Sequence, residues 1–230
     1  MEEKRMLRLL HHAEEYEDAL DMLHPEDALE PGFARSEALK EATPKSRAIR
    51  SRLAVVVGHT KRSPGAKGVK PISIHEYFWN RQLAKHIQLI AGSEGVDCRI
   101  FFRDGIGILG AYKNVATWLP NSCIELHFNA YNGRVKGTET LYGLYDKSKI
   151  WASTVQDAMV ALYGRTGNYD RGIKLRKIGE RGGENVNQLD NIPSCLIEPY
   201  FGDEPSEAKL AEDYLINLAS AIVAAHNQLF

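Results

Sequence analysis

From Leu53 onward, short apolar runs rich in β-branched residues alternate with longer segments of helical periodicity. The strand-like runs are LAVVV (53–57), DCRIFFR (97–103), SCIELHF (122–128), GTETLYG (137–143) and CLIEPYF (195–201). Helices are expected between or after them, at 73–92, 112–118, 147–163 and 204–227. Strands that alternate with helices usually form a partly parallel sheet covered by helices. The sequence therefore predicts an α/β fold with a twisted, mostly parallel or mixed central sheet flanked by helices.

Residues 1–50 have a different pattern from the rest of the chain. Apolar residues at helical spacing predict one amphipathic helix that ends at Pro25, and a second, weaker helix is expected at 36–42. We therefore divide the chain into an N-terminal helical arm or linker (1–50) and a main domain (51–230). The arm is either an extension that packs on the main domain or a docking element, so a homo-oligomer formed through the N-terminal helix is an open alternative.

The overall charge argues against partners that require a strongly basic surface. Lys and Arg number 29, and Asp and Glu number 30, so nothing in this balance indicates binding to nucleic acid or to an anionic membrane. No run approaches the roughly 18 apolar residues of a transmembrane segment. The N-terminus also lacks the apolar core of a secretory signal, so we expect a protein made in the cytoplasm without a signal peptide. The three cysteines stand in apolar runs and are expected to be buried free thiols.

Four residues with metal-binding or acid-base side chains stand at or near the ends of these elements: His59, Glu76, His127 and Glu198. Ligand sites in α/β sheets gather beyond the carboxyl ends of strands, where His59, His127 and Glu198 are expected. Two imidazoles and one carboxylate can hold a zinc ion with one open position, and a further carboxylate can act as general base. Burying the lone carboxylate of Glu198 in its apolar run would cost several kcal/mol, so Glu198 lies either at an exposed strand end or in a functional site, and we favour the functional role.

Two of these residues have alternative interpretations. Ser73 and Glu76 have the spacing of a capping box, in which the glutamate bonds back to the start of the helix. His75 competes with Glu76 as a ligand, but neighbouring side chains on a helix point about 100° apart, so the two are not expected to bind one metal. His127 shares one face of its strand with Glu125, which indicates either a ligand with a supporting carboxylate or a polar sheet face.

In this order and context, the segments resemble the zinc-dependent N-acetylmuramoyl-L-alanine amidases of the family often called amidase 3. The resemblance covers about residues 51–230. It is carried by GH (58–59), Glu76 at a helix start, HFNA (127–130), GTETLY (137–142), RGIK (171–174) and IPSCLIEPYF (192–201). The chain departs from the family where Thr60 replaces a second glycine, and where residues 113–116 replace the usual Arg and Ala-Asn pair. Neither departure touches a proposed ligand.

The resemblance implies a peptidoglycan hydrolase that cleaves the amide bond between N-acetylmuramic acid and the L-alanine of the stem peptide. One zinc ion (Zn2+) per chain would be held by His59, Glu76 and His127. Glu198 would be the catalytic carboxylate, and Asn129 would bind the substrate. The partner would be peptidoglycan (muramyl peptide), and residues 51–230 would be the zinc amidase catalytic domain.

Two other functions stay open at this point. A zinc carboxypeptidase-like peptidase uses similar ligands, but it usually places its first histidine and glutamate within a few residues, whereas sixteen residues separate His59 from Glu76. A non-catalytic peptidoglycan-binding protein would keep the scaffold without hydrolysis. A cell-wall substrate without a signal peptide indicates a phage or prophage endolysin, released by phage lysis or carried on a virion. A fragment of a longer exported protein is the alternative.

Overall fold

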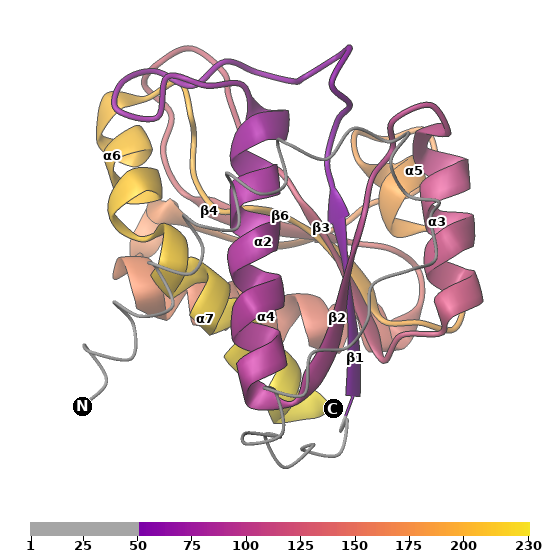
Figure 1. Cartoon of the computed structure of the whole chain (residues 1–230). Coiled ribbons are helices and arrows are strands. Elements are labelled where there is room, and N and C mark those ends of the chain that lie inside the picture. The colour runs from indigo at the N-terminus through magenta and orange to yellow at the C-terminus, as the bar shows by residue number, and fades with distance from the viewer. Residues whose placement is uncertain (1–50) are drawn as a thin grey trace, which may run out of the picture. The chain divides into compact units, whose positions relative to one another are not determined.

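The computed structural model of the chain describes residues 51–230 (Figure 1). The predicted N-terminal helical arm, and oligomerisation through it, lie outside the described residues, so the division of the chain at residue 50 stays a prediction. Six strands form one sheet, in the order β2-β1-β3-β6-β4-β5. They are β1 (Ser51–Val57), β2 (Val96–Phe101), β3 (Ser122–Leu126), β4 (Thr138–Tyr142), β5 (Asp170–Leu175) and β6 (Ser194–Glu198).

The sheet is mixed, as the sequence predicts. Strand β1 pairs in parallel with β2 and β3, and β3 pairs in parallel with β6. Strand β4 is antiparallel to β6 and parallel to β5. The edge strand β5 was not among the predicted strands, because its sequence DRGIKL lacks an apolar run and its side chains are only half-buried or exposed.

Six α-helices lie within the described part of the chain. They are α2 (Glu76–Glu94), α3 (Gly107–Trp118), α4 (Asp146–Tyr163), α5 (Gly183–Val186), α6 (Pro205–Asp213) and α7 (Leu215–Leu229). The single helix predicted at 204–227 is therefore two helices, which meet where Tyr214 leaves helical geometry with φ of −115° and ψ of 15°. Within residues 51–230, none of the helices combines the length and hydropathy needed to cross a membrane.

Helices cover both faces of the sheet, which explains why β1 is a continuous apolar run. Leu53, Val55 and Val57 belong to the larger core, together with side chains of α2, α4 and α7. Ala54 and Val56 point to the other face and pack with residues of α3. Figure 1 shows the same division, with α2, α4 and α7 on one side of the sheet and α3 and α5 on the other.

The parallel register places the carboxyl ends of β1, β3 and β6 side by side, at the same end of the sheet. Val57 lies beside Leu126, and Leu126 lies beside Ile197. The residues that follow these three positions are Gly58, His127 and Glu198. Parallel pairing therefore brings chain segments about 70 residues apart together at the carboxyl ends of the strands, where ligand sites of such sheets form.

At the opposite end of the sheet, a buried histidine of α7 links the amino ends of two strands. The two ring nitrogens of His226 lie 2.8 Å from the hydroxyl oxygens of Ser51 and Ser122, which begin β1 and β3. Burial lowers the pKa of His226 to about 4. The ring is therefore neutral near pH 7, with one nitrogen donating a hydrogen bond and the other accepting one.

We predict that His226 makes the free energy of unfolding fall in acid. Its folded pKa lies below the ordinary value, so the unfolded chain binds the proton first as the pH falls. The contribution is fully present above about pH 6.5 and is lost progressively towards pH 4, with a loss of about 2 kcal/mol by pH 5. Urea unfolding at several pH values, with a chelator present, measures this slope. The His226→Gln variant should lack it, and an equal slope in both proteins would exclude His226 as its source.

Candidate metal centre

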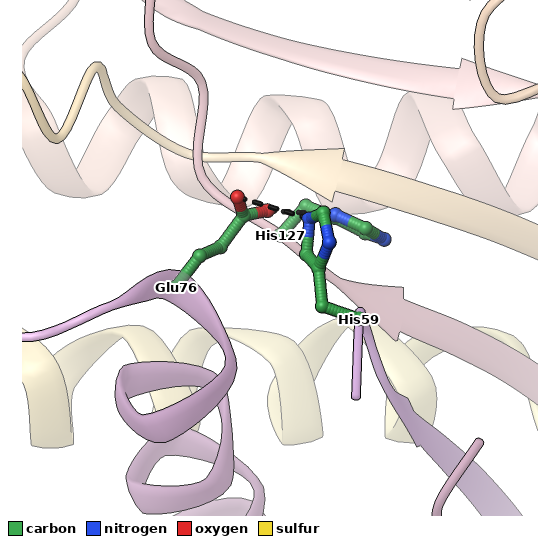
Figure 2. Close-up of side chains that lie close together, drawn as sticks. All are labelled: His59, Glu76 and His127. Carbon is green, nitrogen blue, oxygen red and sulfur yellow. Dashed lines mark hydrogen bonds and ion pairs between the residues drawn. The ribbon is translucent and has the colours of Figure 1, made fainter. Parts of the chain in front are cut away.

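Three residues from three different segments meet at the carboxyl ends of the parallel strands. His59 follows β1, Glu76 is the first residue of α2, and His127 follows β3. One nitrogen or oxygen atom of each lies within 4.8 Å of the others. Figure 2 shows the glutamate side chain reaching from the helix start towards both histidines. The structure thus brings together the three residues proposed as ligands, which we call the triad.

The Glu76 carboxylate lies between the two imidazoles. Its Oε1 is 2.7 Å from His127 Nδ1, and its Oε2 is 3.0 Å from His59 Nε2. Oε1 also accepts a hydrogen bond from the backbone N–H of Phe128 at 3.1 Å. Burial raises the pKa of Glu76, but the hydrogen bonds with His127 and His59 outweigh this effect and hold that pKa at about 2. Glu76 is therefore an ionised carboxylate, and the nitrogens that face it are the candidate ligand atoms.

The capping-box interpretation of Glu76 is wrong. The helix begins at Glu76 itself, three residues later than predicted, and no side chain caps its N-terminus. Ser73 has a φ of 50°, outside the helical range. His75 directs its Nδ1 to the carbonyl oxygen of Gly65 at 3.0 Å and does not belong to the triad.

The backbone around the triad leaves no room for larger residues. His59 has a φ of 68°, in the left-handed region that residues other than glycine rarely adopt. A Cβ atom on Gly58 would lie 2.4 Å from His127 Nε2, and one on Gly65 would lie 2.7 Å from Glu76 Oε2. Glycine at both positions lets the chain pass close to two triad side chains. The Gly-His pair in the sequence thus has a steric reason.

Glu198 ends β6 and lines the same cavity as the triad, a space of about 350 Å³. Its Oε1 lies 3.5 Å from Arg181 Nη2. Its Oε2 is buried and has no hydrogen-bond partner within residues 51–230. Burial raises the pKa of Glu198 to about 8. A buried carboxylate with one unpaired oxygen, in a cavity lined by both polar and apolar side chains, is suited to exchanging a proton with a bound substrate.

The donor set of the triad fits zinc. Two imidazole nitrogens and one carboxylate are ligands that zinc takes in catalytic sites, with a further position left for water or substrate. The electrostatics also favour a cation. Burial lowers the pKa of His127, but hydrogen bonds with Glu125 and Glu76 outweigh it and raise that pKa to about 10. A site whose carboxylates hold a proton this strongly is one that attracts positive charge.

Asn129 lies in a network beside the cavity. Its Nδ2 donates a hydrogen bond to Glu139 Oε1 at 3.0 Å, and its Oδ1 accepts one from Arg181 Nη2 at 3.2 Å. The side chain is buried. The amide therefore links Arg181 on the cavity wall to Glu139, and substrate binding by Asn129 stays a prediction.

Glu139 was not among the residues predicted from the sequence. It is a buried carboxylate of β4 that lies opposite Glu198 in the antiparallel register. Glu139 pairs with Lys174 and with Arg171, whose Nε lies 2.8 Å from Glu139 Oε2. Glu139 and its two partners stand in the segments GTETLY and RGIK, which are part of the family resemblance and which fold as the neighbouring strands β4 and β5.

Two further residues that were not predicted from the sequence lie in the polar, glycine-rich stretch 179–191. This stretch contains α5, and both Arg181 and Asn185 line the cavity. A glycine-rich, polar composition does not reveal which side chain turns inward. Asn185 is buried because it finds hydrogen-bond acceptors on β3, which only the folded chain provides.

Comparison with known proteins identifies the family of this chain. A sequence model described as N-acetylmuramoyl-L-alanine amidase matches residues 53–227. Among solved structures, an N-acetylmuramoyl-L-alanine amidase from Clostridium difficile 630 is 25% identical, with a TM-score of 0.66 over 79% of this chain and 97% of that one. No match was found among the curated proteins.

Two further solved structures are similar in fold. The catalytic domain of CwlV, an amidase from Bacillus (Paenibacillus) polymyxa var. colistinus, is 19% identical, with a TM-score of 0.65 over 77% of this chain and 97% of that one. The catalytic domain of the CD27L endolysin targeting Clostridia difficile is 24% identical, with a TM-score of 0.63 over 76% of this chain and 96% of that one. At these identities the similarity concerns the fold alone.

We predict that Gly58→Ala weakens zinc binding, because the new Cβ atom would displace the His127 ring. The matched control is Gly92→Ala in α2, where a Cβ atom meets nothing within 4 Å and alanine favours the helix. Competition with a chelator measures zinc affinity in both variants. Unchanged affinity in Gly58→Ala would show that the His127 ring does not depend on this close approach.

Proposed function

This chain belongs to the N-acetylmuramoyl-L-alanine amidase family, and we propose that it carries out the reaction of that family with one zinc ion held by the triad. The reaction cleaves the amide bond between N-acetylmuramic acid and the L-alanine of the peptidoglycan stem peptide. The observation that carries the zinc proposal is the meeting of His59, Glu76 and His127 in a cavity that also contains Glu198.

In this proposal, His59 Nε2, the Glu76 carboxylate and His127 Nδ1 hold the ion. When bound, zinc supplies Lewis acidity, which acidifies water and polarises the carbonyl oxygen of the amide. A cation at this place would also favour the ionised form of Glu198. Burial raises the pKa of Glu198 to about 8, and a positive charge nearby favours the ionised form that a general base needs.

Glu198 would carry the proton of the reaction. It takes a proton from the attacking water, whose oxygen bonds to the carbonyl carbon of the lactyl group. The carbon–nitrogen bond then breaks, and Glu198 delivers the proton to the nitrogen of the leaving L-alanine. The unpaired Oε2 supports this role, because no hydrogen bond within the described structure has to break before it can accept a proton.

Arg181 would help to orient the substrate or the base. Its side chain is 70% exposed, and it lies at the cavity beside Glu198 and Asn129. A guanidinium with free donors can bind carbonyl or carboxylate oxygens of the stem peptide. This role is compatible with substrate binding by Asn129, which holds the Arg181 guanidinium through Oδ1.

The proposed function is tested by incubating purified protein with peptidoglycan, with and without a chelator, and identifying the products by mass spectrometry. We expect free stem peptides that begin with L-alanine, lost with chelator and restored by zinc. Shortened peptides still attached to glycan would identify a carboxypeptidase-like enzyme instead. A zinc-loaded protein that binds peptidoglycan without releasing products would be a non-catalytic binding protein.

We predict that Glu198→Gln keeps the fold and the zinc but lowers kcat/KM by about 100-fold or more, because glutamine cannot accept the proton. Circular dichroism and zinc content provide the controls for the fold and the metal. Activity close to that of the wild type would exclude Glu198 as the base. Loss of zinc in this variant would instead place Glu198 among the groups that support the metal.

For the biological setting, we propose a phage or prophage endolysin that is made in the cytoplasm and reaches the cell wall after release by phage lysis. The fold is compatible with this setting, since it is shared with the catalytic domain of the CD27L endolysin as well as with that of the amidase CwlV. Expression in bacteria with and without a holin provides the test. Lysis that requires the holin agrees with the proposal, whereas lysis by the protein alone would contradict it.

A further inference from the structure

Glu125 of β3 is a fully buried carboxylate on which side chains from several segments converge. Arg103 Nη1 donates to Oε1 at 2.8 Å, and the Tyr112 hydroxyl donates to Oε2 at 2.6 Å. Asn185 Nδ2 lies 2.8 and 2.9 Å from the two oxygens. These donors belong to the loop after β2, to α3 and to α5. The carboxylate is therefore fixed from three directions.

The same carboxylate contacts one member of the triad. His127 Nε2 lies 3.0 Å from Glu125 Oε1, while His127 Nδ1 faces Glu76 on the other side of the ring. An ionised carboxylate only accepts hydrogen bonds, so Nε2 must carry the hydrogen in this contact. The lone pair that could bind a metal is then the one on Nδ1.

We propose that Glu125 is a positioning residue for the metal centre, which holds His127 Nε2–H so that Nδ1 faces the triad. The inference rests on the proposed zinc site. Histidine ligands generally donate their second ring N–H to a carboxylate or a carbonyl, which fixes the tautomer and the orientation of the ring. Here the carboxylate is itself held by Arg103, Tyr112 and Asn185, so the ring orientation is tied to three other segments of the fold.

A purely structural role for Glu125 would be to join α3, α5 and the loop after β2. The two roles differ in what they require of His127. A structural hub needs only the three donors from these segments, whereas a positioning residue also needs its contact with Nε2. The contact exists because Glu125 and His127 are two residues apart and share one face of the chain.

The first test compares the zinc affinities of wild type, Glu125→Gln and Glu207→Gln by competition with a chelator. Glu207 is a matched control, because it is also a buried carboxylate paired with an arginine, Arg165, and it contacts no triad residue. We expect zinc to bind Glu125→Gln about 10-fold or more weakly, the usual loss when such a partner is removed, and to bind Glu207→Gln as it binds wild type. Wild-type affinity in Glu125→Gln, or an equal loss in both variants, would overturn the inference.

The second test needs no variant and decides the matter even where Glu125→Gln fails to fold. In the zinc-loaded wild-type protein with 15N-labelled histidine, NMR should show His127 with a protonated Nε2 and a metal-bound Nδ1. A protonated Nδ1 or a metal-bound Nε2 would overturn the role of Glu125 while leaving the zinc site intact. A wild-type protein that binds no zinc would overturn the proposed zinc function together with this inference.

Discussion

The paired contacts of Glu76 with His59 and His127 are the interaction around which the rest of the site is built. They join the first residue of α2 to the ends of β1 and β3, and they depend on the parallel register that places those ends side by side. Glycine at 58 and 65 is required for the same reason, since any Cβ atom there would meet a triad side chain. Sheet register, helix start and loop conformation therefore all serve one arrangement of three side chains.

Around this centre, acidic groups lie in distinct environments. Hydrogen bonds with two histidines lower the pKa of Glu76 to about 2, whereas burial raises the pKa of Glu198 to about 8. One oxygen of Glu198 has no hydrogen-bond partner within the described residues. Glu125 and Glu139 are each held by basic or amide side chains. The proposed roles follow from these surroundings: Glu76, paired with two histidines, binds the metal, Glu198, with one oxygen free, moves the proton, and Glu125 holds a ligand in place.

Much of this could be predicted from the sequence, because it depends on local patterns. The apolar runs of β1, β3 and β6 predicted a partly parallel core. Ligand-type side chains after β1 and β3 and at the start of α2 predicted the three residues that meet as the triad. Other features depend on contacts between distant segments. Strand β5 is stabilised by pairing at an edge and by the Glu139 ion pairs, and the inward position of Asn185 depends on acceptors in β3. No spacing within residues 170–191 reveals either partner.

The central claim is that the triad holds a metal, and a crystal structure of the zinc-loaded protein with anomalous data at the zinc edge tests it most directly. We expect one anomalous peak per chain, about 2 Å from His59 Nε2, His127 Nδ1 and a Glu76 carboxylate oxygen. A peak held by other residues, such as His75, or zinc-loaded crystals without a peak at the triad, would contradict it.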